Sequence, residues 1–375
     1  MNATVRFFLL ALALLAGCKG AQDSLDESII EREPPARNII LLIGDGMGIS
    51  QISAGLYSTG RPLHLEQFRI IGLHKPYATD DLITDSAASA TAFASGQKTR
   101  KSAIGVTPEG EPLPSIFEQA KARGYATGLL TTSSIVHATP AAFIAHVPLR
   151  GQYEDIAEQL SQSKVDFFMG GGMRFFNQRD KDGKNLIEAM ENNGYNIYNA
   201  FEEGLYSITP DFGRSFGYFT ANEDPRPKHE GREYLPPATR IGMRFLQKRS
   251  SKGFLFMVEG AQIDWAGHEQ NQDYMISEML DFDEAVGEAL AFAKRNKGTL
   301  VVVTSDHETG GYAIQPGSTR DSLIGGFTSD YHTGSMVPVF AYGPRANLFR
   351  GLYENTAIYD KMVKALGWKD PPAEE

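Results

Sequence analysis

Short apolar runs alternate with helical patterns along most of this chain, and this alternation limits the folds that it can adopt. Each run has the length of a β-strand and is rich in β-branched or aromatic residues. The runs lie at 38–43, 125–131, 165–169, 253–259, 299–304 and 337–342. Strands that are apolar on both faces and separated by helices form a mainly parallel sheet covered on both sides. We therefore expect an α/β fold of three layers, with helices on both faces of a mainly parallel central sheet.

Amphipathic patterns between the runs predict the covering helices. The clearest lies at 274–294, where one stripe is apolar and contains Met275, Met279, Phe282, Val286, Ala289, Leu290 and Ala293. A second helix is predicted at 115–122 and is closed by Gly124. The stretch 174–237 has weak periodicity, so we expect peripheral helices and loops there. No low-complexity linker divides the chain, so we expect residues 38–375 to form a single domain with this stretch as an insertion.

Composition and charge exclude some classes of protein. Hydrophobic residues make up 42% of the 375-residue chain, which suits a globular protein with a sizeable core. The formal net charge is -10, and Lys and Arg form no basic stripe, so nucleic acid is not expected as an obligate partner. The acidic excess does not exclude a phosphate substrate, because bound divalent metals reverse the sign of the local field.

The N-terminus has the features of an export signal. Arg6 precedes an apolar run at 7–16, which is too short to span a bilayer comfortably. The run ends in Leu-Ala-Gly followed by Cys18, which is the single cysteine, and this sequence resembles a bacterial lipobox. We therefore expect a signal peptide at 1–17, a lipid anchor at Cys18, a polar tether at 18–37 and a periplasmic, membrane-anchored protein. A plain secretory signal with an incidental cysteine stays an alternative.

Four potential metal ligands stand at the ends of three predicted strands. Asp45 follows the first run, Glu259 ends the fourth, and Asp306 and His307 follow the fifth. In parallel sheets, ligands bind outside the carboxyl ends of the strands. A lone Asp after a strand is a helix cap or turn residue about as often as it is a ligand. The inference therefore rests on the four residues together.

The segment after Glu259 contains Asp264 and, four residues later, His268. This spacing places both side chains on one side if the segment turns helically, and a carboxylate with an imidazole suits zinc. Such a pair also arises often by chance. Gly260, Gly267 and Trp265 favour a tight, shaped loop over a solvated helix face.

Ser86 precedes an almost uninterrupted run of small residues within 83–98. Such a run packs a helix very close to its neighbours. Ser86 would lie at the N-terminus of this helix, where unpaired N–H groups favour a phosphoryl anion. A simple helix cap is the alternative. No G-x-S-x-G elbow is present nearby, so metal coordination would have to activate the hydroxyl.

Five segments, in order, resemble the motifs of the alkaline phosphatase family. They span most of the chain after the tether and read IGDGMG at 43–48, TDSAASATA at 84–92, HATPAAFIAH at 137–146, EGAQIDWAGH at 259–268 and TSDHETGG at 304–311. The resemblance implies hydrolysis of small phosphate monoesters through a phosphoserine intermediate, with two zinc ions and one magnesium ion. A phosphodiesterase or sulfatase on the same scaffold, or a lipoprotein that binds metal or phosphate without turnover, stays an alternative. Monomer and homodimer both stay open.

The resemblance also assigns roles to individual residues. It implies one zinc site formed by Asp45, Asp306 and His307 with Ser86 as a further ligand, and a second formed by Asp264, His268 and His332. The magnesium site would use Asp45, Thr139 and Glu259. Arg150 would grip the phosphate bidentately, with Arg100 as the alternative. His137 and Trp265 stand where some members carry Asp and Lys near the phosphate and the third metal, which puts metal preference in question.

Overall fold

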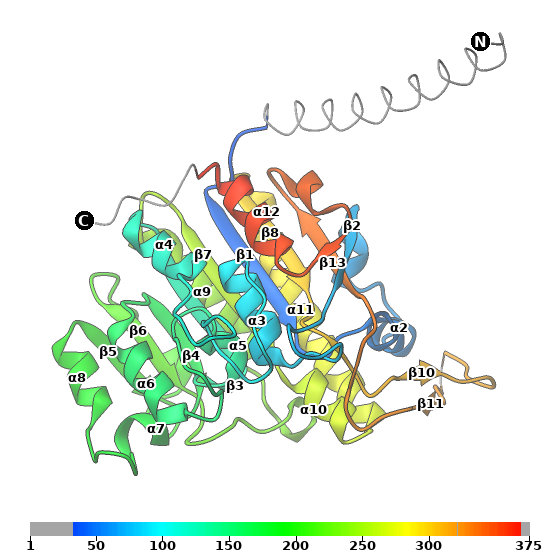
Figure 1. Ribbon diagram of the computed structural model, residues 1–375, viewed down its shortest axis with the longest axis horizontal. Coiled ribbons are helices and arrows are strands. Elements are labelled where there is room, and N and C mark those ends of the chain that lie inside the picture. The colour runs from blue at the N-terminus through cyan, green and yellow to red at the C-terminus, as the bar shows by residue number, and fades with distance from the viewer. Residues whose placement is uncertain (1–32, 321, 369–375) are drawn as a thin grey trace, which may run out of the picture.

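The computed structural model describes residues 33–320 and 322–368, and its core is a ten-stranded sheet (Figure 1). The strand order is β14-β2-β13-β8-β1-β7-β3-β4-β6-β5. The bounds of these strands are β1 Asn38–Gly44, β2 Ile70–Lys75, β3 Ala126–Ser134, β4 Phe167–Gly171, β5 Tyr195–Asn199, β6 Ser215–Phe219, β7 Phe254–Gly260, β8 Thr299–Thr304, β13 Val337–Tyr342 and β14 Gly351–Glu354.

The sheet is mainly parallel, which confirms the sequence prediction. β1 lies between β7 and β8 and is parallel to both. β3 continues the parallel array beside β7, followed by β4, β6 and β5. β13 is antiparallel to both of its neighbours, β8 and β2. The carboxyl ends of β8, β1, β7 and β3 therefore meet at one edge near the middle of the sheet.

Two hydrophobic cores lie on opposite faces of the sheet, and successive residues of β1 enter them alternately. Ile39 and Leu41 enter one core, while Ile40 and Leu42 enter the other. All seven residues of β1 are buried, because helices cover both faces. The first core packs against helices α3 Ser86–Ser95, α4 Ile116–Ala122, α5 Ala138–Ala141, α6 Tyr153–Gln162 and α12 Ala357–Leu366. The second packs against α2 Ile49–Ser58, α9 Leu235–Arg249, α10 Gln262–His268 and α11 Gln272–Arg295.

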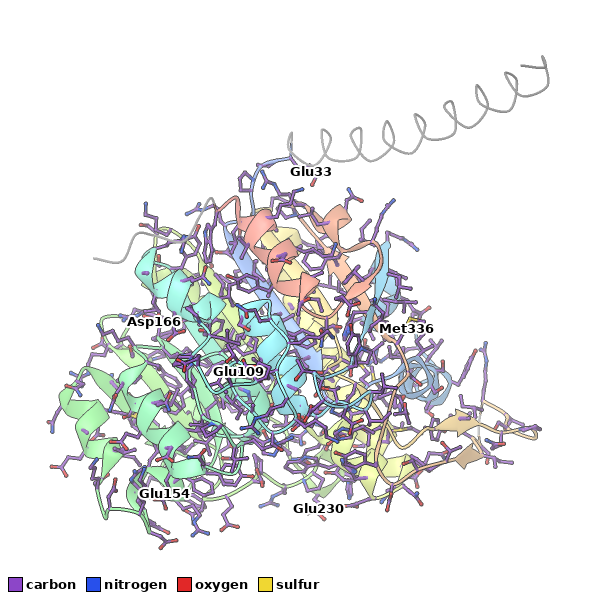
Figure 2. The ribbon with its side chains drawn as sticks, viewed as in Figure 1. Glu33, Glu109, Glu154, Asp166, Glu230 and Met336 are labelled. Atoms are coloured by element: carbon purple, nitrogen blue, oxygen red, sulfur yellow. The ribbon has the colours of Figure 1, made fainter. Side chains whose placement is uncertain are left out.

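The six predicted strands and both predicted helices are present, with ends shifted by a few residues. The helix expected at 115–122 is α4, which Ser115 caps by accepting from the amide of Glu118. The helix expected at 274–294 is α11. Ion pairs connect helices on both faces to the sheet. Asp166, labelled in Figure 2, precedes β4 and accepts from Lys121 of α4 at 2.6 Å and from Arg249 of α9 at 3.2 Å.

The insertion at 174–237 differs from the prediction of helices and loops. It contains helices α7 Arg174–Asn177 and α8 Leu186–Asn192, but also strands β5 and β6, which extend the parallel sheet at one edge. The edge strand β5 is half-buried along most of its length, so it lacks the continuous apolar run of a central strand. The segment after Glu259 also differs from the loop expected there, since it forms the buried helix α10.

Shorter elements complete the described part of the chain. They are the strands β9 Glu308–Thr309, β10 Ala313–Ile314, β11 Gly325–Gly326 and β12 His332–Thr333 and the 3-10 helices η1 His64–Gln67, η2 Leu205–Ser207, η3 Lys228–Glu230 and η4 Ala346–Phe349. β12 pairs with β9, and β10 pairs with β11. Within residues 33–320 and 322–368, no helix combines the length and apolarity that a bilayer crossing needs. The expected signal peptide, Cys18 and most of the tether lie outside these residues.

Candidate metal and phosphate site

Three neighbouring strands bring four acidic or imidazole side chains to one edge of the sheet. Ile43 of β1 pairs with Glu259 of β7 on one side and with Thr304 of β8 on the other. Asp45 follows β1, and Asp306 and His307 follow β8. Asp45, Glu259, Asp306 and His307 are all 0% exposed. The parallel register thus concentrates three carboxylates in the protein interior, as the strand-end pattern predicts.

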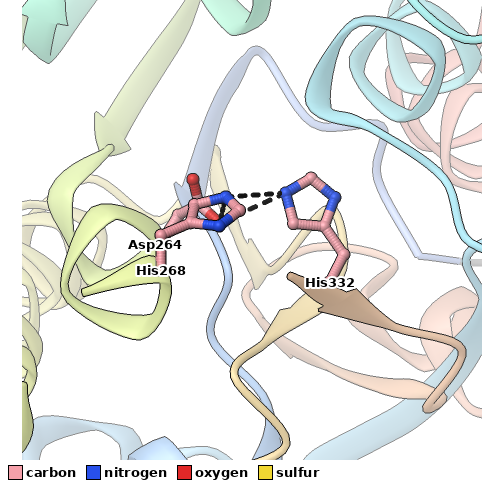
Figure 3. Close-up of side chains that lie close together, drawn as sticks. All are labelled: Asp264, His268 and His332. Atoms are coloured by element: carbon pink, nitrogen blue, oxygen red, sulfur yellow. Dashed lines mark hydrogen bonds and ion pairs between the residues drawn. The ribbon is translucent and has the colours of Figure 1, made fainter. Parts of the chain in front are cut away.

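Two groups of side chains converge here in a way that suits metal ions. Asp264, His268 and His332 form the first group, and Asp45, Asp264 and His307 form the second; in each, the ligand atoms lie within 4.8 Å of one another. Figure 3 shows the first group, in which His268 and His332 face each other with their Nε2 atoms 3.2 Å apart. Asp264 belongs to both groups, so its carboxylate lies between them.

Asp306 completes the second group. Nε2 of His307 lies 3.1 Å from Oδ2 of Asp306 and 3.5 Å from Oδ1 of Asp45. The structure therefore brings together the six carboxylate and imidazole side chains that the resemblance assigns to the two zinc sites. It adds that Asp264, expected in one site only, also lies within reach of the other.

In each of the three histidines, Nδ1 contacts an oxygen outside the two groups and Nε2 faces the groups. Nδ1 of His268 lies 2.7 Å from the Asp330 carbonyl, and Nδ1 of His332 lies 2.7 Å from the Thr84 carbonyl. Nδ1 of His307 lies 3.2 Å from the Thr309 hydroxyl. A carbonyl accepts only, so Nδ1 of His268 and Nδ1 of His332 each carry a proton, and Nε2 is the atom that a metal ion would bind. This is the arrangement in which outer hydrogen bonds orient metal-binding imidazoles.

Several buried atoms of the site have no hydrogen-bond partner, which shows that the residues fit cations. These atoms are both carboxylate oxygens of Asp45, Oδ2 of Asp306, Nε2 of His307 and Oε1 of Glu259. Buried polar atoms are nearly always paired, and buried charges are compensated by ions of opposite sign or by metals. Carboxylate and imidazole ligands together suit zinc.

The pKa shifts of these side chains also reflect buried negative charge. Burial, together with the Asp306 and Asp264 carboxylates, raises the pKa of Asp45 well above its usual range. Burial also raises the pKa of Glu259 to about 7, although the Thr131 hydroxyl acts in the opposite direction. A hydrogen bond to Asp264 raises the pKa of His268 to about 9. Carboxylates crowded in this way need positive charge nearby, whether protons or metal ions.

Comparison with known proteins agrees with this geometry. The family model described as alkaline phosphatase matches residues 36–323 and 318–368. Alkaline phosphatase 3 of Bacillus subtilis is 31% identical over 95% of each chain, and the Escherichia coli alkaline phosphatase is 32% identical over 90% of this chain and 87% of its own. The chain belongs to the alkaline phosphatase family.

A solved structure also matches this alkaline phosphatase closely. The enzyme from the Antarctic bacterium TAB5 is 41% identical, covers 90% of this chain and 100% of its own, and superimposes with a TM-score of 0.86. Variants of that enzyme, in which a histidine is replaced by aspartate or glutamate, hold magnesium in a site named M3. The fold and the family together make this chain a phosphomonoester hydrolase.

Ser86 of this phosphatase is the first residue of α3, two residues after Thr84, whose carbonyl accepts from Nδ1 of His332. It is 2% exposed, and Asp85 caps the helix by accepting from the amide of Ala88 at 3.1 Å. The same turn is tied to the site, because the Ser89 hydroxyl donates to the Asp306 carbonyl at 2.9 Å. All residues from Ser86 to Ala94 are buried and all but Phe93 are small, so the helix packs close to its neighbours α5 and α12, as the sequence predicts.

Arg150 lies beside this turn, held by Asp85. Its Nη1 donates to the Asp85 carboxylate at 3.0 Å, and its Nη2 lies 3.4 Å from Nε2 of His137. Arg100 instead donates to the carbonyl of Pro148. These contacts favour Arg150 over Arg100 as the guanidinium near Ser86.

His137 and Trp265 form one wall of the site. Their rings meet edge to face with centroids 6.1 Å apart. Burial and the Arg150 charge lower the pKa of His137 to about 3, so its ring is neutral at physiological pH. Thr139 follows in α5, and its hydroxyl lowers the pKa of Glu259, so it lies near that carboxylate.

Sequence reasoning missed the residues that hold these side chains in place. Asp85 fixes Arg150, the Thr131 hydroxyl donates to Glu259, and the Thr309 hydroxyl donates to Asp264. Each stands inside or next to a segment that sequence analysis already singled out. A period of two along an extended chain would have placed Thr309 on the same side as His307.

Proposed function

We propose that this alkaline phosphatase hydrolyses phosphate monoesters through a phosphorylated Ser86. The hydroxyl oxygen of Ser86 would form a bond to phosphorus as the ester oxygen departs with its alcohol and takes up a proton. Water would then cleave the phosphoserine, releasing inorganic phosphate and restoring the hydroxyl. The position of Ser86 carries the proposal: it begins a helix, where amide dipoles favour an anion, and this turn contacts His332 through the Thr84 carbonyl and Asp306 through the Ser89 hydroxyl.

We infer that the residues of the site hold two zinc ions and one magnesium ion, as in the family. Asp45, Asp306 and His307, with Ser86, would hold one zinc, and Asp264, His268 and His332 the other. Asp45, Thr139 and Glu259 would hold magnesium. Metal ions in such a site supply positive charge that activates a hydroxyl and stabilises the departing oxygen.

Arg150 would bind the non-bridging phosphate oxygens. A guanidinium donates two parallel hydrogen bonds to a phosphate, which fixes its orientation. Asp85 supports this role, since its carboxylate accepts from one nitrogen of Arg150 and leaves other donors available.

The rival functions separate in one experiment. A monoesterase should hydrolyse p-nitrophenyl phosphate much faster than bis-p-nitrophenyl phosphate or p-nitrophenyl sulfate. A diesterase or sulfatase would reverse that order, and a lipoprotein that only binds metal or phosphate would release no p-nitrophenol from any of them.

Trapping the intermediate tests the role of Ser86 directly. After rapid acid quenching, mass spectrometry should find one phosphate on the peptide that contains Ser86 and none in Ser86→Ala. The Ala variant should keep its metals and lose several orders of magnitude in turnover. Activity within about tenfold of wild type would contradict the phosphoserine route.

We also propose that the protein is exported and anchored by a lipid on Cys18, as a monomer or homodimer. The lipobox-like sequence supports the anchor, and Cys18 is the single cysteine available for acylation. Cys18→Ala should therefore move the protein out of the detergent phase in Triton X-114 partitioning. Labelled palmitate that enters the Ala variant, or never enters the wild type, would contradict the anchor.

A further inference from the structure

The site opens toward solvent at His268. The side chain of His268 is 33% exposed, whereas those of Asp264 and His332 are 8% and 5% exposed. This inference rests on the proposed function and assigns the departing oxygen to the zinc that Asp264, His268 and His332 would hold. The organic part of the substrate is attached to that oxygen, so it must extend past His268 toward solvent.

Tyr331 borders this opening. Its ring is stacked on that of His332, with centroids 4.5 Å apart and an interplanar angle of 9°, and its centroid lies 5.8 Å from that of His268. Tyr331 is nevertheless 42% exposed. The Lys101 ammonium lies 5.2 Å from the Tyr331 ring centroid and 3.1 Å from Asp81. The ring is therefore held in a fixed orientation by its neighbours and still presents apolar surface to solvent.

A second exposed apolar side chain lies on the neighbouring segment. The segment from Asp81 to Thr84 runs next to the segment from Tyr331 to Gly334: His332 bonds to the Thr84 carbonyl, and a Cβ placed on Gly334 would lie 3.3 Å from Cδ1 of Ile83. Leu82, in the middle of the first segment, is 78% exposed. A single exposed Leu needs no explanation, but this one lies on the segment that runs next to Tyr331 at the mouth of a polar site.

We propose that Leu82 and Tyr331 form a leaving-group platform that favours phosphate monoesters whose alcohol carries an aromatic base, as in nucleoside 5′-monophosphates. A flat heterocycle packs on an exposed aromatic ring and an apolar side chain, whereas a compact polyol offers no comparable apolar face. The stabilisation that one aromatic contact of this kind provides corresponds to a preference of roughly threefold to tenfold in kcat/KM.

The test compares two substrates that differ only in the base. Adenosine 5′-monophosphate and ribose 5-phosphate both release a primary ribose hydroxyl, so the bond that breaks is the same. The wild type should prefer the nucleotide by roughly threefold to tenfold. Tyr331→Ala should abolish this preference, mainly through KM, and Tyr331→Phe should retain it because the ring remains. Tyr206→Ala removes a 76% exposed tyrosine elsewhere and should leave the preference unchanged.

Three further outcomes would overturn the platform or the proposed function. Tyr331→Ala could act only by displacing His332; it would then lower kcat/KM for both substrates equally and raise the inhibition constant of inorganic phosphate, which would overturn the platform. An equal kcat/KM of the wild type for both substrates would also overturn it, while leaving phosphomonoester hydrolysis intact. If the wild type hydrolyses neither substrate, the proposed function itself fails, and the platform with it.

Discussion

Thr309 donates its hydroxyl to the Asp264 carboxylate and lies 3.2 Å from Nδ1 of His307. One side chain thus connects the two groups of metal-ligating residues. Because the hydroxyl hydrogen is committed to Asp264, the oxygen accepts from Nδ1 of His307, which leaves Nε2 of His307 as the metal-facing atom. Threonine at this position can do both because its hydroxyl donates once and accepts as well.

We expect Thr309→Val to weaken metal binding at both groups, since the shape is kept but the hydroxyl is lost. Removing an outer hydrogen bond of this kind typically costs about 10- to 100-fold in metal affinity. Zinc content should be measured after dialysis against graded chelator concentrations, with Thr309→Ser as the control that keeps the hydroxyl. Identical retention curves for Val, Ser and wild type would show that the hydroxyl does not orient these ligands.

His332→Ala should remove one zinc selectively. The variant loses one of three protein ligands from the group that contains Asp264 and His268, whereas the group at Asp45, Asp306 and His307 keeps all of its side chains. Elemental analysis after dialysis should find about one zinc fewer per chain than in wild type. His229→Ala, which removes an exposed histidine, is the matched control. Full zinc retention in His332→Ala would refute the ligand assignment.

The strand-end carboxylates were predictable because burial makes central strands continuously apolar, and the first polar residue after each run stands at the edge where ligands bind. Asp45 and Asp306 follow such runs directly. Strand β5 was not predictable in this way, because an edge strand is half-exposed and its sequence reads as polar loop. β14, with two exposed residues in four, was missed for the same reason.

The side chains that hold the ligands were harder to find than the ligands. Asp85 caps α3, a role that any Asp before a helix fulfils, and its contact with Arg150 joins residues 65 positions apart. Sequence periodicity reports on local geometry only. The sharing of Asp264 between two groups likewise depends on how α10 packs against the loop after β8, which no local pattern specifies.

The pair formed by His146 and Glu118 should make stability depend on pH. Nε2 of His146 lies 3.1 Å from Glu118, and Nδ1 lies 2.6 Å from the Gly105 carbonyl. Although burial acts against it, these contacts raise the pKa of His146 above its usual value. A raised pKa means that the stabilisation is complete below about pH 6.5, the value in unfolded chains, and is lost as pH rises through the folded value.

We therefore expect His146→Asn to be less stable than wild type at pH 5.5, by about 0.2–1 kcal/mol as for partly exposed ion pairs. The Asn side chain keeps a donor near the Gly105 carbonyl but loses the charge. At pH 9 the difference should shrink. Urea unfolding of both proteins at the two pH values measures it. A difference that stays constant or grows with pH would mean that His146 is not charged in the folded protein at pH 5.5.

His137 should set the preference of the third site for magnesium. Its neutral ring lies 3.4 Å from the Arg150 guanidinium and brings no negative charge there, whereas magnesium prefers oxygen ligands and gains from each carboxylate. We expect His137→Asp to bind magnesium more tightly, in keeping with the TAB5 variants in which aspartate or glutamate replaces a histidine and magnesium occupies the M3 site.

The wild type should also be inhibited by excess zinc, because imidazole is a good zinc ligand and the third site is poorly matched to magnesium. Both proteins should be stripped with the same chelator and titrated with each metal, following bound magnesium by calorimetry as well as activity. His137→Asn is the matched control, because it is similar in size to Asp and carries no charge. If Asp and Asn variants bind magnesium equally, charge at this position is not what the third site lacks. If both match the wild type, His137 acts only on Arg150 and Trp265, which its ring contacts.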